Sequence, residues 1–338
     1  MKKALIVSFY GIGNAGGVER VSLYIKEILE EAGYAVKVIE MLRFHLPKFD
    51  FLFQSIVISF RLFFMKKDLV VVNSWHAFLY PADISFSHGT TQGYTEHVST
   101  FKRFSGAGLT AWMEKTAAKR AKRVLAVSVH VKDDLVSLYK INPEKINVLP
   151  NCVDEEKYVP SKRITDKKDN IILFCGRLEI RKGLLALKSL SDFLESIDGW
   201  QLLIASNVKQ NTELFEMNKK THIVYGLTAE DMPDFYLRGD VLFFPSLYEG
   251  FSMATLEALS CGIPVLGTDF VVTDELKPYA FCKDITTIVD NPREIVSEAE
   301  KLVSQWKNQK QFIHEIVAAQ FGKKIYSTQF LQHIEGTK

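Results

Sequence analysis

Residues 243–265 read FFPSLYEGFSMATLEALSCGIPV, a run that predicts a buried strand, a loop and a helix in succession. The strand ends at Pro245, and the loop carries Glu249. The helix begins near Ser252, a residue type that caps helix N-termini, and it ends at Gly262, just ahead of a proline. A strand–loop–helix succession of this kind is the building unit of α/β domains with parallel sheets.

The start of this predicted helix is suited to binding an anion or a sugar. Its backbone N–H groups and its dipole favour a bound anion near residues 252–255. Glu249 lies just ahead of that point, and Glu257 follows eight residues later. A carboxylate is a poor ligand for phosphate, but it accepts hydrogen bonds from sugar or ribose hydroxyls. Taken alone, such a pair is better interpreted as two ordinary exposed carboxylates. The adjoining anion-binding helix start is what favours a ligand role.

Outward from this segment, short apolar runs alternate with helical patterns along most of the chain. The expected buried strands are residues 4–9, 35–39, 69–72, 124–127, 171–175, 201–205, 241–244 and 264–267. Helical patterns between them include residues 18–32, 183–196, 232–237 and 293–306. Such alternation predicts an α/β fold whose parallel sheets are covered by helices on both faces.

The alternation breaks once, in a polar and highly charged stretch near residues 154–169. We therefore expect two Rossmann-like, doubly wound domains, residues 1–154 and 170–310, joined by a linker at residues 155–169. Residues 311–338 have helical periodicity but no strand after them. They are expected to form a helix that packs back toward the N-terminal domain.

Composition narrows the classes of protein to which the chain can belong. The 338 residues carry 42 Lys and Arg against 40 Asp and Glu, a net charge of +2, so no nucleic-acid partner is expected. The first 150 residues nevertheless have an excess of basic side chains, and the remainder has an excess of acidic ones. Four scattered cysteines without a CxxC pair argue against a zinc knuckle or a disulfide framework. No signal peptide is recognisable, so a cytoplasmic protein is expected.

A glycine-rich loop follows the first expected strand, with glycines at positions 11, 13, 16 and 17. The spacing at residues 11–16 is that of a dinucleotide-binding fingerprint, for which Glu40 is the candidate ribose ligand. Two other interpretations stay open. The glycines can simply let a helix and a strand pack closely, or their backbone N–H groups can reach a phosphate or a sugar hydroxyl.

Residues 51–65 form an apolar, aromatic-rich stretch, FLFQSIVISFRLFFM. It is shorter than the roughly 20 apolar residues that cross a bilayer, and it contains Arg61. The favoured interpretation is a helix buried against the sheet. The alternative is an interfacial helix, because basic residues flank it. This alternative predicts peripheral contact with anionic lipid on the inner face of the cytoplasmic membrane.

Residues 249–265 resemble the Glu-x7-Glu signature of the retaining glycosyltransferases of family 4, which have the two-domain GT-B fold. The resemblance continues along most of the chain in the family's order. Further similar segments are residues 16–20, 86–89, 127–128, 148–154, 176–183, 224–226 and 236–246. One departure is Cys152, where the family usually has glycine. The resemblance implies two Rossmann-like domains that face a central cleft.

This resemblance also implies an activity, the transfer of a sugar from a nucleotide-diphosphate sugar to an acceptor hydroxyl. The residues implied at the donor diphosphate are Arg177, Lys182, Gly16, Gly17, Ser252 and Met253. The residues implied at the donor sugar and ribose are Glu249, Gly250, Phe251 and Glu257. His88 and Glu249 are the implied catalytic residues, and His76 competes with His88 for the histidine's role.

The chemistry of transfer bears on cofactors. Breaking the anomeric bond loads negative charge onto the departing diphosphate, and that charge must be stabilised. The chain has no Asp-x-Asp pair for a divalent metal, whereas Arg177, Lys182 and a helix N-terminus are present, so neither a metal nor another cofactor is expected.

The expected substrates are a UDP-sugar, with a GDP-sugar as the alternative, and a glycan or lipid-linked glycan acceptor. The expected setting is the synthesis of a cell-surface polysaccharide or lipopolysaccharide. Two other functions stay open: an NAD-dependent oxidoreductase that uses residues 11–16, and a non-catalytic nucleotide-sugar binder.

Overall fold

The structure is a computed structural model that describes residues 1–8, 16–40, 50–98, 106–160 and 169–335. The chain divides into two compact units. Unit 1 is Met1–Asn151 with Lys324–Lys338, and unit 2 is Cys152–Lys323. The expected linker at residues 155–169 therefore begins inside unit 2, and its residues 161–168 lie outside the described part of the chain.

Unit 1 is built on a six-stranded parallel sheet of order β2-β1-β3-β4-β5-β6. Its strands are β1 (Lys2–Ser8), β2 (Tyr34–Ile39), β3 (Leu69–Asn73), β4 (Ile84–Ser87), β5 (Arg123–Ala126) and β6 (Ile146–Val148). Its helices are α1 (Gly17–Glu31), α2 (Asp50–Phe64), α3 (Thr91–Val98), α4 (Gly106–Arg120), α5 (Val129–Ser137), the short η1 (Pro143–Lys145) and α11 (Lys323–Glu335). Every residue of β3 is buried, as a central parallel strand requires.

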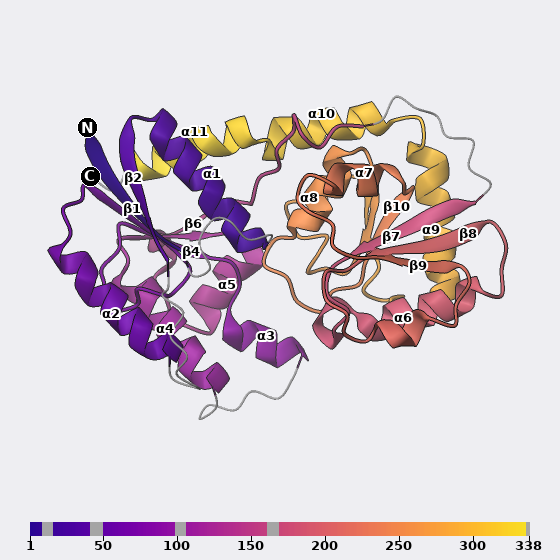
Figure 1. Cartoon of the computed structure of the whole chain (residues 1–338), viewed down its shortest axis with the longest axis horizontal. Coiled ribbons are helices and arrows are strands. Elements are labelled where there is room, and N and C mark those ends of the chain that lie inside the picture. The colour runs from indigo at the N-terminus through magenta and orange to yellow at the C-terminus, as the bar shows by residue number, and fades with distance from the viewer. Residues whose placement is uncertain (9–15, 41–49, 99–105, 161–168, 336–338) are drawn as a thin grey trace. The chain divides into compact units, whose positions relative to one another are not determined.

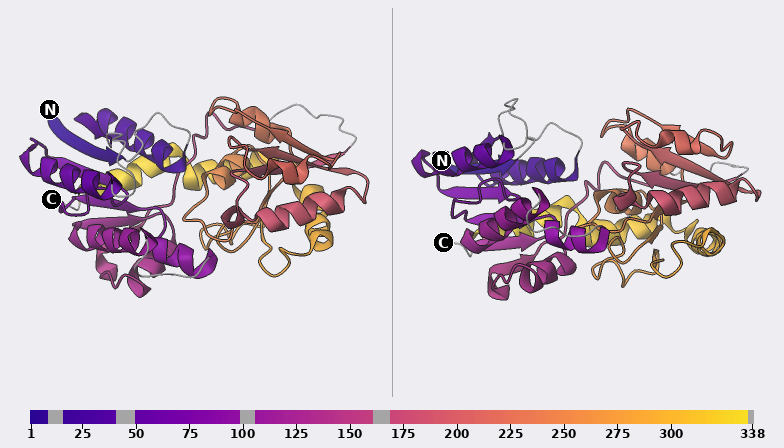
Figure 2. Two further views of the ribbon diagram at one scale, coloured as in Figure 1. Left: turned by 60° about the horizontal axis from the view of Figure 1, so that its bottom comes forward. Right: turned by 90° about the horizontal axis from the view of Figure 1, so that it is seen from below.

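Unit 2 repeats this architecture with the strand order β12-β11-β10-β7-β8-β9. Its strands are β7 (Asn170–Cys175), β8 (Trp200–Ala205), β9 (Thr221–Val224), β10 (Val241–Phe244), β11 (Val265–Gly267) and β12 (Cys282–Asp284). Its helices are α6 (Leu184–Leu194), α7 (Met232–Leu237), α8 (Met253–Ser260), α9 (Pro292–Trp306), α10 (Lys310–Phe321) and the short η2 (Ile180–Lys182) and η3 (Thr212–Phe215). In Figure 1, α7 and α8 lie on one side of this sheet and α6 lies on the other, and Figure 2 shows the ribbon turned by 60° and by 90° from that view.

The predicted fold class is confirmed, because both units are parallel sheets with helices between the strands. All eight expected strands are present, with ends that differ by at most two residues. Four short strands, β4, β6, β9 and β12, were not among those expected. Each has only three or four residues, too few for a hydrophobic pattern to stand out.

The C-terminal segment differs from the single expected helix, because α10 and α11 meet at Gly322. The backbone of Gly322 is extended, with φ −67° and ψ 153°, and it pairs with Val153 as an isolated β-bridge. A Cβ at this position would lie 2.4 Å from the carbonyl oxygen of Ala318. Glycine therefore allows the chain to break here, and α10 belongs to unit 2 whereas nearly all of α11 belongs to unit 1.

Candidate functional site

The segment from β10 to α8 has the predicted form. β10 is fully buried, and Ser252 caps α8 by accepting a hydrogen bond from the backbone N–H of Thr255 at 3.2 Å. The Thr255 hydroxyl is also buried, and it finds no hydrogen-bond partner among the described residues. A buried hydroxyl without a partner, beside a helix N-terminus, marks a place suited to a polar ligand.

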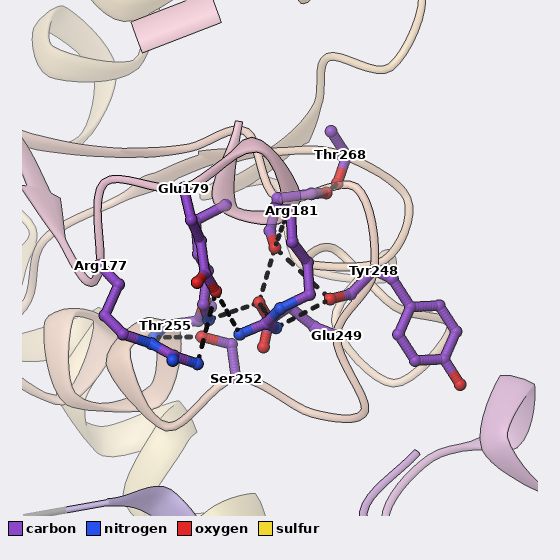
Figure 3. A network of polar contacts seen from close by, with 10 residues as sticks. Arg177, Glu179, Arg181, Tyr248, Glu249, Ser252, Thr255 and Thr268 are labelled. Atoms are coloured by element: carbon purple, nitrogen blue, oxygen red, sulfur yellow. Dashed lines mark hydrogen bonds and ion pairs between the residues drawn. The ribbon is translucent and has the colours of Figure 1, made fainter. Parts of the chain in front are cut away.

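Glu249 is the centre of a polar network in the loop that precedes α8 (Figure 3). Its Oε1 lies 2.5 Å from Lys182 Nζ and 3.4 Å from Arg181 Nη1, and the Ser246 hydroxyl donates to it at 2.6 Å. Only 12% of the Glu249 side chain is exposed. Burial by itself raises the pKa of this carboxyl, but the charges of Lys182 and Arg181 reverse that effect and hold the pKa below its usual value. Glu249 is therefore ionised at neutral pH.

Both cations come from η2, which is fastened to the β10–α8 loop. The Leu247 N–H donates to the carbonyl of Arg181 at 2.8 Å. Gly183 follows η2 with φ 80°, in the left-handed region that favours glycine. A Cβ at this position would lie 2.1 Å from the carbonyl oxygen of Pro245. The glycine thus permits the close approach that brings the two cations to the loop.

Arg181 is the member of this network that sequence reasoning missed. The predicted Arg177 is 61% exposed and pairs with Glu179 at 3.4 Å. Arg181 is only 23% exposed, and it pairs with Glu179 at 2.9 Å as well as with Glu249. A signal was present in the sequence, because Arg181 directly precedes Lys182 after the carboxyl end of a buried strand.

The remaining predicted donor residues lie on the same strand–loop–helix segment. Gly250 and Phe251 are buried in the loop, and Met253 is the first residue of α8. Glu257 is buried within α8, where its Oε2 accepts a hydrogen bond from the Tyr236 hydroxyl at 2.9 Å. Sequence proximity brings these residues to one region of unit 2, and their ligand roles stay predictions.

The predicted histidine lies in unit 1, just after β4. His88 Nε2 is 2.5 Å from Asn73 Oδ1, at the carboxyl end of the neighbouring strand β3. Desolvation by burial lowers the pKa of His88 to about 4 and that of the competing His76 to about 3. The His76 ring is buried and stacks on Trp75 with centroids 4.1 Å apart, whereas His88 keeps part of its surface exposed. His88 is therefore the better placed of the two to meet a ligand.

The N-terminal glycine motif is described only at its end. Residues 9–15 lie outside the described part of the chain, so Gly11 and Gly13 of the dinucleotide fingerprint do as well. Gly16 precedes α1 with extended backbone, and Gly17 is the first residue of that helix; both are exposed. Their roles at the donor stay predictions.

Within the ranges that the structure describes, no three His, Cys, Asp or Glu side chains are grouped so that they could hold a metal ion. Independence of metal stays a prediction from the chemistry of the basic groups.

The helix α2 is buried on one side only. Ile58 and Leu62 belong to the core between α2 and the sheet. A row of apolar side chains at intervals of three or four residues faces outward: Phe53, Val57, Phe60 and Phe64, which are 56, 37, 57 and 86% exposed. The favoured interpretation of a helix buried against the sheet therefore holds for the face with Ile58 and Leu62, whereas the opposite face is exposed. Across the described ranges, no helix is both long and apolar enough to span a bilayer.

Comparison with known proteins finds a family match for each half of the chain. Residues 15–157 match the family Glycosyltransferase Family 4, and residues 156–316 match Glycosyl transferases group 1. Among solved structures, that of WaaG, a glycosyltransferase involved in lipopolysaccharide biosynthesis, superposes with a TM-score of 0.78 at 16% identity, covering 96% of this chain and 98% of that one. At that identity the likeness shows the fold alone.

Two curated relatives are more similar in sequence over shorter stretches. The O-antigen chain mannosyltransferase RfbU of Salmonella typhimurium is 27% identical over 173 residues, which are 48% of this chain and 46% of that protein. The UDP-Gal:alpha-D-GlcNAc-diphosphoundecaprenol alpha-1,3-galactosyltransferase of Escherichia coli is 29% identical over 174 residues, 46% of this chain and 44% of that protein. The matched stretches thus span about half the length of these relatives.

Proposed function

Because both halves of the chain match glycosyltransferase families, we propose that the protein is a retaining glycosyltransferase that uses a nucleotide-diphosphate sugar. The observation that carries the proposal is the network around Glu249. It combines a buried, ionised carboxylate with two cations, beside the N-terminus of α8. The carboxylate suits the hydroxyls of a sugar, and the cations and helix start suit the diphosphate.

The network also suggests how the donor enters. In the structure Lys182 is paired with Glu249, so a diphosphate must compete with that carboxylate for the ammonium group. Arg181 and Ser246 also contact Glu249 Oε1, and they keep the carboxylate in place when Lys182 turns to phosphate. During transfer, Lys182 and the N–H groups at the start of α8 stabilise the charge that develops on the leaving diphosphate.

The donor and acceptor are proposed from the relatives. One relative's name specifies a UDP-sugar donor and a diphosphoundecaprenol-linked acceptor, and the other is named as an O-antigen chain mannosyltransferase. We favour a UDP-sugar here, with a GDP-sugar as the alternative. The acceptor is then a hydroxyl of a glycan or lipid-linked glycan that becomes part of a cell-surface polysaccharide or lipopolysaccharide.

A lipid-linked acceptor agrees with the outward row of α2. Residues 51–67 contain three basic side chains and no acidic one, so the exposed aromatic row lies within a positively charged segment. Apolar side chains that insert at the headgroup level, together with Lys and Arg that attract anionic lipid, are the features of an interfacial helix. We propose that α2 contacts the surface of an anionic membrane peripherally.

The activity is tested by incubating the purified chain with a panel of nucleotide sugars and following release of UDP or GDP. We expect slow hydrolysis of one donor without acceptor, and loss of about 100-fold in that rate in Glu249→Gln, because a charged group at the reacting sugar is removed. Glu216→Gln, an exposed carboxylate of unit 2, is the matched control and should keep the wild-type rate.

Three outcomes contradict the proposal. Binding of a nucleotide sugar with neither hydrolysis nor transfer identifies a non-catalytic binder. Stabilisation by NAD but by neither UDP nor GDP favours the oxidoreductase. Full activity in Glu249→Gln removes that residue from the site.

A further inference from the structure

A chain of polar side chains, buried except for the partly exposed His88, crosses the carboxyl edge of the sheet in unit 1. Ser8 ends β1 and lies beside Asn73, which ends β3, and His88 directly follows β4. Ser22 of α1 joins the first two, because its hydroxyl lies 2.9 Å from Ser8 Oγ and accepts from Asn73 Nδ2 at 2.5 Å. In a parallel sheet these strand ends meet at one edge, the edge at which α/β proteins bind ligands.

The surroundings of Asn73 determine which terminal atom of its side-chain amide is the nitrogen and which is the oxygen. The side chain is fully buried, and one of its two terminal atoms lies 2.8 Å from the carbonyl oxygen of Val18. A carbonyl oxygen only accepts hydrogen bonds, so the atom that faces it must be the amide nitrogen. The other terminal atom is therefore Oδ1, and this is the atom 2.5 Å from His88 Nε2.

The orientation of the Asn73 amide in turn determines the tautomer of the His88 ring. Since Oδ1 is only an acceptor, Nε2 must carry the hydrogen, and the neutral ring then has its lone pair on Nδ1. Burial lowers the pKa of His88 to about 4, so the ring is neutral at physiological pH. A nitrogen with a lone pair repels phosphate oxygens, which are acceptors themselves, and it accepts a hydrogen bond from a hydroxyl.

We propose that Asn73 is a positioning residue that fixes the Nε2–H tautomer of His88, so that Nδ1 accepts a hydrogen bond from a hydroxyl of a sugar substrate. The tautomer follows from the contacts of Asn73 alone, whereas the sugar hydroxyl rests on the proposed function. His88 then acts as an orienting acceptor that distinguishes a sugar from a phosphate, and it transfers no proton.

The tautomer is tested by nitrogen NMR of the full chain labelled with ¹⁵N-histidine, with the signals of His88 identified by their loss in His88→Gln. At neutral pH we expect a protonated Nε2 and an unprotonated Nδ1. Asn73→Asp keeps an acceptor for Nε2 and should keep this tautomer. Asn73→Leu, of similar shape but without polar atoms, should give a mixture of tautomers, while the signals of the exposed His222 in unit 2 stay unchanged.

A wild-type His88 that carries its proton on Nδ1 overturns the proposal, even if Asn73→Leu does not fold. The kinetic readout uses the donor identified in the hydrolysis assay. We expect kcat to fall about tenfold in Asn73→Leu, as for other residues that orient a ligating histidine, and less in Asn73→Asp. An intact tautomer in Asn73→Leu overturns the positioning role of Asn73, and a mixture of tautomers in Asn73→Leu with unchanged kcat overturns the link to the sugar. A chain without transferase activity leaves the NMR result valid, so failure of the two proposals is distinguishable.

Discussion

Glu249 is an ionised carboxylate almost enclosed by protein, and the cations that compensate it meet at one of its oxygens. Lys182 is the nearer at 2.5 Å, and Arg181 lies 3.4 Å away. Replacing Lys182 by Met leaves the buried charge with its weaker cationic partner. Removal of one partner from a buried ion pair costs up to about 5 kcal/mol, and because Arg181 remains we expect a loss of about 2 kcal/mol in the free energy of unfolding.

Urea unfolding of a double-mutant cycle measures this coupling. Lys182→Met combined with Glu249→Gln should be more stable than Lys182→Met alone, because the uncompensated charge is gone. Lys188→Met is the matched control, since its pair with Asp192 is exposed at the surface and should contribute less than about 1 kcal/mol.

The same coupling should depend on pH with a defined sign. The pKa of Glu249 is lower in the folded protein than its usual value of 4.5, so the stabilisation is complete above that value. It is lost as the pH falls from there through the lowered pKa, because the carboxylate becomes protonated. The stability difference between wild type and Lys182→Met should therefore shrink in acid, and a difference that is constant from pH 7 downward would refute the role of this charge.

Single residues differ in how well their structural role can be predicted from the sequence. Ser252 is predictable as a helix cap, because capping depends on residues at most three positions away, and the structure confirms it. The place of Arg181 depends on a contact between η2 and a loop more than 60 residues later in the chain. A pattern in the sequence identifies it as basic but does not say which carboxylate it meets.

The same distinction holds for helices and strands. β7 and β10 were predictable from their apolar runs, and the structure confirms them. β4 was not, since it contains only Ile84, Ser85, Phe86 and Ser87 and becomes a strand by pairing between β3 and β5. α4 buries mainly alanines, so it lacks the regularly spaced large apolar side chains that indicate an amphipathic helix in a sequence.

The outward row of α2 gives the prediction at the scale of an element. The full chain should sediment with vesicles that contain phosphatidylglycerol and stay in solution with pure phosphatidylcholine, and added salt should weaken the binding. Combined replacement of Phe53, Phe60 and Phe64 by Ser should reduce binding at least about tenfold, because three partly inserted aromatic side chains are lost.

Folding should not suffer in this variant, because the three rings are largely exposed. Phe312→Ser is the matched control: its ring is 49% exposed on α10 of unit 2, and its loss should leave vesicle binding unchanged. Wild-type protein that stays in the supernatant, or a triple variant that binds as well as wild type, would refute the proposed contact of α2 with the membrane.

At the scale of the whole molecule, unit 1 combines two separate parts of the chain, Met1–Asn151 and Lys324–Lys338. Phe330 of α11 is fully buried, 5.9 Å from the ring of Phe86, and Arg123 Nη1 donates to the carbonyl of His333 at 2.8 Å. Unit 2 is formed from the uninterrupted stretch Cys152–Lys323. Periodicity predicts a helix in the last residues, but which sheet receives it depends on contacts some 200 residues apart.

Because each of the two units has its own sheet and core, hydrogen exchange measured with and without ligand can show which unit binds it. UDP at 100 times its Kd should stabilise the unit that binds it by about 2.7 kcal/mol. We expect slower exchange of backbone amides in η2 and from Leu247 to Thr255, because the proposed diphosphate site lies between these segments. The strands β1–β3 of unit 1 should change little.

NAD is the comparison ligand and should protect neither region. Protection by NAD at the start of α1, with none by UDP near α8, would place the nucleotide in unit 1 and favour the dinucleotide interpretation of residues 11–16.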